Sequence, residues 1–402
     1  MRKSSLPTKG KASGSAPKRV ALAFPYGRAF VETVVDGIYD YARNEANWHL
    51  IRFPERLSPS LEWLRGWNGD GAFVIFASKN DVEIARSLPF PVVNLTAYFP
   101  SPGVTTVTAD HREIGRLAAM HLLERRFQKF GFYGSRDLYF SELRREGFVS
   151  TIHDHGASCS VLEVSPHLNS GRSWLRQEQE LERWLLSLQP PVAVMASTDL
   201  RANMLMESCR HLGIKIPEQL AVMGVDNDPV VVEHVQPSLT SIARNDRLAG
   251  EVAARELATL MAGKAKPGKW VLMPPTGVIA RQSTETLAVE DPDINGLVQY
   301  IRQHVSEKFG VERLLEITGW SRRRLEMRFQ EHLGEAPYAL INRLRVEEAQ
   351  RLMKQNPSEL LSKIASASGF NNLRQFRLVF QRITGQRHSR YRTLCKSGDA
   401  LK

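Results

Sequence analysis

The pattern of apolar and polar residues divides the chain into two parts with different periodicities. In residues 20–226, short runs of Val, Ile, Leu, Ala and Phe alternate with segments whose apolar positions recur every three to four residues. Continuous apolar runs predict buried strands, and the 3.6-residue period predicts helices. The predicted strands are residues 20–24, 49–53, 71–76, 91–95, 103–110, 160–164, 192–196 and 220–226, and the predicted helices are 30–46, 112–126, 141–155, 173–188 and 199–212. This alternation predicts an α/β fold with parallel sheets covered on both faces, in which ligands bind beyond the carboxyl ends of strands.

Residues 358–392 predict two short helices joined by a tight turn. The apolar positions of the first helix are Leu360, Leu361, Ile364 and Ala367, and those of the second are Phe376, Val379, Phe380 and Ile383. Gly369 stands between them, where a sharp turn needs a residue without a Cβ. Such a pair is typical of the helix-turn-helix, whose second helix enters the DNA major groove. An ordinary helical hairpin with a solvated polar face is the alternative interpretation.

A second copy of this plan lies upstream, in residues 311–334, and favours DNA binding. Its apolar positions are Leu314, Leu315, Ile317, Leu325, Phe329 and Leu333. Gly319 marks the turn, and Ser321 is the expected N-cap of the second helix. The segment between the copies predicts one rigid helix from Pro337 to Pro357. Two units at a fixed separation could read successive major grooves on one face of DNA.

Polar residues near the start of each second helix are the predicted DNA contacts. They are Arg322, Arg323, Glu326 and Met327 in the first unit, and Asn372, Arg374, Gln375 and Leu378 in the second. Because Arg forks onto guanine and Gln onto adenine, we expect Arg323 and Arg374 to read bases. We expect phosphate contacts or ion pairs with the connecting helix from Arg322, Arg324, Arg345 and Arg377.

Charge supports the same division of the chain. Residues 1–19 carry six Lys or Arg and no acid, residues 290–402 carry 20 Lys or Arg and 13 acids, and the middle is close to neutral. Basic ends and a near-neutral middle place polyanion binding at the ends. An excess of +7 on the last 113 residues is also compatible with a merely well-solvated surface.

Length and motifs exclude several classes. A chain of 402 residues predicts more than one domain, and its apolar content of 42% suffices for a full core. The sequence holds no run of 18 apolar residues, no secretory h-region in residues 1–19 and no metal-ligand spacing among its three cysteines. We also find no dinucleotide, Walker, G-x-S-x-G or H-E-x-x-H motif. We therefore expect a cytoplasmic protein without cofactor, metal or enzymatic activity.

The last hundred residues resemble the DNA-binding domain of the AraC family. The shared positions are R-x-x-x-A at 345–349, I-A at 364–365, G-F at 369–370, F-x-x-x-F at 376–380, Gly385 and Y-R at 391–392. The family usually has Thr-Pro after the glycine, where this chain has Gln386, Arg387 and His388. The resemblance implies two helix-turn-helix units, and the departure concerns only the entry to the last short helix.

Most of residues 20–285 resembles the sensor of LacI/GalR-type regulators, which is itself similar to periplasmic sugar-binding proteins. The resemblance is carried by TADHREIG at 108–115, STDLRANM at 197–204, VMGVDND at 222–228 and ARQST at 280–284. It implies two α/β lobes around a ligand. By resemblance, Asp226 holds sugar hydroxyls, Arg144 is the ligand arginine and Phe140 replaces a wall Trp. Asp199 is a further candidate contact, although a helix N-cap is the better interpretation for it. Phe24, Tyr26 and Phe140 are candidate walls, and core packing is the better interpretation for any one of them.

Each of the two principal ligand candidates has a structural alternative. Asp226 could be a helix N-cap, and Arg144 could form a surface salt bridge. A sugar site needs carboxylates, a forked Arg and flat apolar walls, which these residues supply together if the fold gathers them.

The two resemblances together predict a two-lobed periplasmic-binding-protein-like α/β sensor followed by an all-α AraC-type double helix-turn-helix domain. We predict a basic tail at 1–19, a sensor at 20–285, a linker at 286–295, a DNA-binding domain at 296–395 and a tail at 396–402. The combination implies a transcriptional activator controlled by a small sugar, xylose or another pentose. Promoter DNA, RNA polymerase and a second copy of the chain are the expected partners. A sugar-binding protein or a sugar-modifying enzyme with an accessory helical domain is the alternative.

Overall fold

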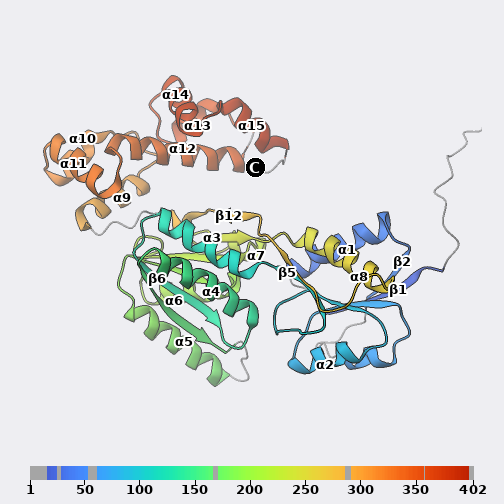
Figure 1. The fold of residues 1–402 in the computed structure, drawn as a ribbon. Coiled ribbons are helices and arrows are strands. Elements are labelled where there is room, and N and C mark those ends of the chain that lie inside the picture. Colours follow the sequence, from blue (N-terminus) through green and yellow to red (C-terminus); the bar gives the residue numbers. More distant parts are fainter. Residues whose placement is uncertain are drawn as a thin grey trace, which may run out of the picture. The chain divides into compact units, whose positions relative to one another are not determined.

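The computed structural model describes residues 16–24, 29–52, 61–165, 171–285, 291–356 and 358–397. The chain divides into two compact units, Met1–Thr286 and Leu287–Lys402. Figure 1 shows α/β structure in the first unit and helices alone in the second. Among the described residues, no helix combines the length and hydropathy needed to cross a membrane.

In the part of unit 1 that the structure describes, there are two six-stranded sheets, each of which forms one lobe. The first sheet has the order β11-β5-β4-β3-β1-β2, and all of its pairings are parallel. Its strands are β1 (Lys18–Ala23), β2 (Trp48–Arg52), β3 (Gly71–Val74), β4 (Val92–Asn94), β5 (Thr105–Ala109) and β11 (Trp270–Met273). The second sheet has the order β12-β10-β9-β8-β6-β7, and only β12 is antiparallel to its neighbour. Its strands are β6 (Lys129–Ser135), β7 (Ser158–Val164), β8 (Val192–Ala196), β9 (Leu220–Asp226), β10 (Thr240–Ala243) and β12 (Gly277–Ile279).

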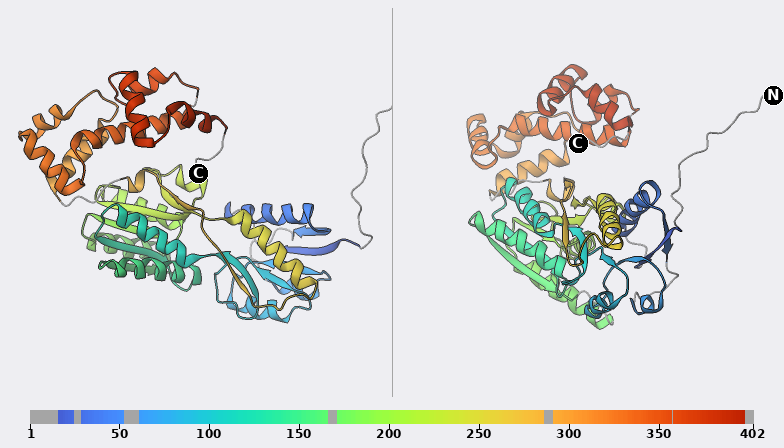
Figure 2. Two further views of the ribbon diagram at one scale, coloured as in Figure 1. Left: turned by 45° about the horizontal axis from the view of Figure 1, so that its top comes forward. Right: turned by 45° about the vertical axis from the view of Figure 1, so that its right-hand side comes forward.

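Helices cover both sheets, and the chain crosses between the lobes three times. The helices of unit 1 are α1 (Ala29–Asn44), α2 (Lys79–Ser87), α3 (His111–Glu124), α4 (Tyr139–Asp154), α5 (Gly171–Ser187), α6 (Asp199–His211), α7 (Pro229–Val232) and α8 (Asp246–Met261), with 3-10 turns η1 (Leu61–Gly66) and η2 (Gln282–Thr284). The crossings lie between β5 and α3, between β10 and α8, and between β11 and β12, because α3 packs on α4 whereas α8 packs on α1 (Figure 2). These crossings bring residues distant in sequence to the junction of the lobes.

Each lobe buries its strands in apolar clusters, as the continuous apolar runs predict. The first sheet lies between one cluster that includes Val20, Ile38 and Phe73 and another that includes Phe76 and Val92. In the second lobe, the strands β8 and β9 pack in a cluster with α5 and α6. Phe24 belongs to the first cluster and is 6% exposed, so it packs in the core.

The described residues of unit 2 form seven helices in two packed halves. They are α9 (Pro292–Gln303), α10 (Val311–Thr318), α11 (Arg322–Leu333), α12 (Pro337–Gln355), α13 (Leu361–Ala367), α14 (Leu373–Thr384) and α15 (His388–Ser397). The helix α12 joins the halves, because Leu340 and Ile341 pack with α9–α11 while Val346 and Met353 pack with α13–α15. Its first residue is Pro337, as expected, whereas Pro357 lies outside the described residues. The helix α9 begins within the segment predicted as a linker.

The two helix-turn-helix units, α10–α11 and α13–α14, have the predicted turns. Gly319 caps α10 in the left-handed conformation, with φ 65°. Ser321 caps α11 by accepting from the backbone N–H of Arg324, as expected. At Gly369, φ is +78°, and a Cβ would lie 2.2 Å from the carbonyl oxygen of Val305. Any side chain at this position would therefore clash with the backbone.

Some predicted apolar positions of these helices are exposed. They are Leu360, Ala367, Ile383 and Ile317. Leu360 is the N-cap of α13, and the buried face of that helix includes Ile364 and Ala365. The side chain of Ser368 also lies buried, because its hydroxyl donates to the carbonyl of Ile364 at 2.6 Å. The expected role of Arg345 is wrong as well, since this side chain is buried and donates to the carbonyls of Glu307 and Phe309.

Candidate ligand site and nucleic-acid interface

Asp226 ends strand β9 at the edge where ligands bind in parallel sheets. Its backbone has φ +110° and that of Asn227 has φ +50°, a left-handed region that non-glycine residues seldom adopt. The N-cap alternative for Asp226 is wrong, because the side chain that caps α7 is that of Asp228, which accepts from the N–H of Val230 at 3.0 Å. Strained backbone of this kind clusters at functional sites.

Arg144 lies on α4, and its side chain is 1% exposed. Its guanidinium donates to the carboxylate of Asp226 at 3.3 Å, to the carbonyl of Ser197 and to Nδ1 of His111 at 3.3 Å. The surface-salt-bridge alternative is therefore wrong. Burial lowers the pKa of Arg144, and the nearby carboxylate of Asp226 raises it. A buried cation that is held by a carboxylate and a carbonyl presents a fixed fork of donors.

His111, the first residue of α3, completes the surroundings of Arg144. Burial and the two arginines Arg144 and Arg244 hold the pKa of His111 well below its ordinary value, so the ring is neutral. Because Nδ1 accepts from Arg144, the proton resides on Nε2, which can donate to the hydroxyl of Thr108 at 3.2 Å.

A second arginine, Arg244, faces the same carboxylate from the crossing between β10 and α8. It lies 3.4 Å from Asp226 and 2.8 Å from Asp246. Its guanidinium also stacks over the ring of Phe30, 4.8 Å from the centroid. Sequence reasoning missed Arg244, because its place beside Asp226 follows from the parallel pairing of β9 with β10, which leaves both residues at the same sheet edge.

Asp199 lies in this cluster but does not have the N-cap role that was expected of it. The N-cap of α6 is Thr198, whose hydroxyl accepts from the N–H of Arg201. The carboxylate of Asp199 instead accepts from the hydroxyl of Ser241 at 2.6 Å and from the N–H of Asp228 at 2.8 Å. Gly224 permits this approach, since a Cβ there would lie 2.2 Å from Oδ1 of Asp199. Burial, followed by the charge of Asp226, raises the pKa of Asp199 to about 8.

Aromatic rings border the charged groups on one side. The ring of Phe140 lies 5.0 Å below the guanidinium carbon of Arg144, and the ring of Tyr98 lies 5.6 Å from that of Phe140. Tyr26, the other candidate wall residue, lies outside the described residues. The structure thus brings Asp226, Arg144, Asp199 and Phe140 together at the junction of the lobes. We call these four residues, with Arg244 and His111, the ligand cluster. Carboxylates, forked cations and ring faces are the groups that recognise a polyhydroxylated ring.

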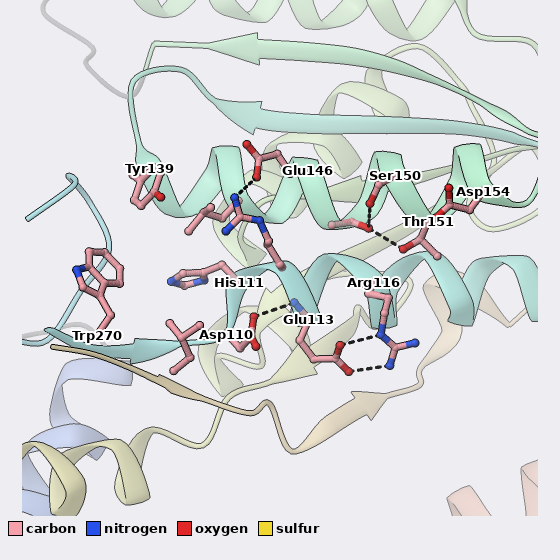
Figure 3. A pocket seen from close by; sticks show the side chains of 14 residues that line it. Asp110, His111, Glu113, Arg116, Tyr139, Glu146, Ser150, Thr151, Asp154 and Trp270 are labelled. Carbon is pink, nitrogen blue, oxygen red and sulfur yellow. Dashed lines mark hydrogen bonds and ion pairs between the residues drawn. The ribbon is translucent and has the colours of Figure 1, made fainter.

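A separate groove of about 720 Å³ lies between α3, α4 and β11 (Figure 3). Tyr139 and Trp270 meet at one end with their ring centroids 6.1 Å apart. Its charged side chains include the ion pairs Glu113–Arg116 and Arg112–Glu146. The groove borders the cluster through His111 but is lined by neither Arg144 nor Asp226.

In the first helix-turn-helix unit, the predicted contacts are exposed at the start of α11. The side chains concerned are Arg322, Arg323, Glu326 and Met327. Arg322 donates to Glu312 on α10 at 2.7 Å, and Arg324 stacks over Trp320. Exposure and position leave Arg323 and Glu326 suited to reach base edges in a major groove.

In the second unit, α14 presents Arg374 and Leu378, whose side chains are exposed, the latter by 65%. Asn372 caps α14 by accepting from the N–H of Gln375 at 2.8 Å. The side-chain amide of Gln375 donates to the hydroxyl of Tyr338 on α12 at 3.2 Å. Asn372 and Gln375 thus already have partners within the chain. The side chains of Arg374 and Leu378 take no part in capping α14.

Family models match both parts of the chain. A periplasmic binding protein-like domain matches residues 119–284, and a helix-turn-helix domain matches residues 314–393. The chain therefore combines a periplasmic-binding-protein-like sensor with an AraC-type helix-turn-helix domain and is a DNA-binding regulator of transcription, not an enzyme.

Regulators of transcription are similar to this chain over nearly their full length. The xylose operon regulatory protein of Escherichia coli is 28% identical over 385 residues, which are 93% of this chain and 96% of that protein. Its counterpart from Haemophilus influenzae is 25% identical and covers 94% of this chain and 98% of its own length. The solved structure of the xylose-binding transcription activator xylR matches with a TM-score of 0.71 and 26% identity, over 94% of this chain and 99% of that one.

Proposed function

We propose that the chain activates transcription of sugar-catabolic genes when a small sugar, xylose or another pentose, binds at the junction of its lobes. The observation that carries this proposal is Asp226, which stands between Arg144 and Arg244 with the ring of Phe140 beside them. A sugar hydroxyl can donate to the carboxylate while a neighbouring hydroxyl accepts from a guanidinium. Its ring face can pack on Phe140.

The printed names of the relatives support a pentose. Two of them are xylose operon regulators, and the solved relative is described as xylose-binding. The same description, transcription activator, supports positive control, which implies contact with RNA polymerase. In this proposal two copies of the chain bind adjacent DNA sites. The protein acts in the cytoplasm, where bacterial promoters lie.

DNA binding in this proposal uses α11 and α14 in successive major grooves. Arg323 and Arg374 are the proposed base readers, with Glu326 and Leu378 on the same exposed faces. The proposed additional contacts from Arg322, Asn372 and Gln375 would go chiefly to phosphates or to the edges of the grooves, because these side chains also serve intramolecular bonds.

A thermal-shift panel of D-xylose, L-arabinose, D-ribose and D-glucose tests the proposed ligand. Because a ligand stabilises the state it binds by mass action, about 100 times its Kd contributes roughly 2.7 kcal/mol. We expect D-xylose or another pentose to raise the melting temperature of unit 1 by about 5 °C or more.

Two variants locate the binding site. Asp226→Asn removes the charge that holds both arginines, and we expect it to weaken sugar binding at least about tenfold. Asp228→Asn is the matched control two residues away, since Asn caps a helix as well as Asp does. No shift with any sugar, or equal affinity in Asp226→Asn and the wild type, would contradict the proposed site.

A further inference from the structure

The strained turn after β9 is held in place by hydrogen bonds from Ser241 and Arg281. Asp226 and Asn227 both have positive φ, and neither is a glycine. The N–H of Asn227 donates to the hydroxyl of Ser241 at 3.0 Å, and its side-chain oxygen accepts from Arg281 at 2.8 Å. A conformation of this kind persists only where surrounding bonds fix it, so these bonds determine where the carboxylate of Asp226 points.

Arg281 belongs to the last described segment of unit 1 and is hydrogen-bonded to the second sheet through several atoms. Its two terminal nitrogens divide their bonds, one to the carbonyl of Leu239 at 2.9 Å and the other to Asn227. Its backbone N–H and carbonyl both bond to the hydroxyl of Thr240, at 2.7 and 2.9 Å. One guanidinium therefore joins Leu239, the residue before β10, to Asn227, the residue after Asp226.

The segment that carries Arg281, residues 281–285, ends one residue before the boundary between the units at Thr286 and Leu287. Its other anchors lie away from the ligand cluster. Ser283 donates to the carbonyl of Val222 at 2.6 Å, and Arg125 on α3 donates to the carbonyl of Thr284 at 2.9 Å. Of the hydrogen bonds described for this segment, the one from Arg281 to Asn227 reaches the ligand turn directly.

We infer that Arg281 is a positioning residue that couples the ligand turn to the connection with the DNA-binding unit. This inference rests on the proposed function. When a sugar binds to Asp226, the preferred geometry of the turn 226–228 changes. The hydrogen bond between Asn227 and Arg281 then shifts the preferred geometry of residues 281–285 as well. Coupling is a free energy shared by two sites, so loss of this bond lowers the effect of sugar on DNA affinity.

The test is the ratio of duplex affinities with and without saturating D-xylose, measured on the full chain by fluorescence anisotropy. Allosteric couplings of this kind typically amount to about 5- to 150-fold. Arg281→Lys keeps the charge but cannot fork to Leu239 and Asn227 together. We expect the ratio in Arg281→Lys to fall to about a third of the wild-type ratio or less, while D-xylose still binds.

Two further variants separate coupling from stability. Arg125→Lys weakens an anchor of the same segment that does not touch the turn, so it lowers the melting temperature and leaves the ratio unchanged. Asn227→Gly tolerates the positive φ and removes the acceptor, so it reproduces the effect of Arg281→Lys, and the double variant is no worse than either single one.

The outcomes distinguish the inference from the function on which it rests. Equal ratios in the wild type and in Arg281→Lys, or equal losses in Arg281→Lys and Arg125→Lys, would overturn the coupling role alone. A wild-type chain that binds none of the tested sugars would overturn the proposed function and the inference with it.

Discussion

At the scale of single residues, the ligand cluster is held together by a balance of buried charges. The cations of Arg144 and Arg244 face the carboxylates of Asp226 and Asp246, and Asp199 adds a third acid. A buried charge that loses its partner costs several kcal/mol, so the pairing of these two arginines with two carboxylates stabilises the cluster against loss of either charge. Burial raises the pKa of the third acid, Asp199, so that it is largely protonated at neutral pH.

The raised pKa of Asp199 predicts a pH dependence of stability with a definite sign. The ordinary value is 3.8, and the folded value is about 8. The folded state therefore binds the proton more tightly than the unfolded state, and the stabilisation is complete below pH 4 and lost as pH rises through 8. Asp199→Asn, which resembles the neutral acid, removes this loss. Melting temperatures of both proteins, measured from pH 5 to 9, should show the variant gaining on the wild type as pH rises.

Ser241→Ala serves as the control for this measurement, because it removes a hydrogen bond of Asp199 without removing the titrating group. It should lower the melting temperature while the pH-dependent loss persists. A constant difference between Asp199→Asn and the wild type from pH 5 to 9 would show that Asp199 does not titrate in this range.

At the scale of elements, the two recognition helices are built to the same plan. Both α11 and α14 have 12 residues, begin at a polar N-cap whose side chain accepts from the N–H three residues on, and end at a left-handed glycine. In both, the residue two positions after the N-cap is an exposed arginine, Arg323 or Arg374. Because each arginine stands two residues after its N-cap, the two occupy equivalent places at the helix ends that we propose enter a groove.

Arg374→Ala should remove base discrimination at one position of the DNA site. A bidentate contact to guanine contributes about 1–3 kcal/mol of discrimination, so the preferred base should lose about 5- to 150-fold of its advantage. Arg382→Ala is the matched control, because this arginine lies in the last turn of the same helix. Affinity selection from a random duplex library, carried out with each variant, measures the base discrimination that each retains. Equal weakening of specific and random DNA by Arg374→Ala would assign it to phosphate contact.

The elements that could be predicted from sequence are those with a strong local period. Strands β8 and β9 have the predicted bounds, 192–196 and 220–226, because both are continuous apolar runs at the centre of a sheet. The periodicity did not reveal α2, a helix of nine residues with few apolar positions, or β12, an edge strand of three residues. Short elements at the margin of a core take their structure from tertiary contacts, which leave little trace in local sequence.

The same reason limits prediction of the site. Asp226, Arg144, Asp199 and Phe140 were proposed largely by resemblance, and the structure gathers them. Sequence reasoning did not find Arg244, His111 and Ser241. The pairing of β10 with β9 places Ser241 and Arg244 beside the acids. The packing of α3 on α4 places His111 beside Arg144. In the DNA-binding unit, no local pattern distinguishes the buried Arg345 from the exposed arginines. Only the carbonyls of residues 307 and 309, folded back onto α12, determine its role.

At the scale of the whole molecule, a sensor and a DNA-binding unit are joined through one short segment. The sensor can influence DNA binding only to the extent that its ligand distinguishes two conformations. The helix α12 packs with both helix-turn-helix units and fixes their separation. Once one recognition helix is bound, binding of the other is therefore intramolecular, and the pair binds more tightly than either alone. We therefore expect sugar binding and DNA binding to change each other's affinity by the same factor.

The affinity of the full chain for a selected duplex, titrated over salt with and without saturating D-xylose, tests this account most directly. We predict a steep fall of affinity with salt, as expected for multiple phosphate contacts, and a duplex affinity that D-xylose changes by about fivefold or more. At a D-xylose concentration that just saturates the wild type, Asp226→Asn should weaken the response to sugar but leave the salt dependence intact. A chain that binds duplex DNA without salt dependence, or whose DNA affinity is the same with and without bound sugar, would contradict the account.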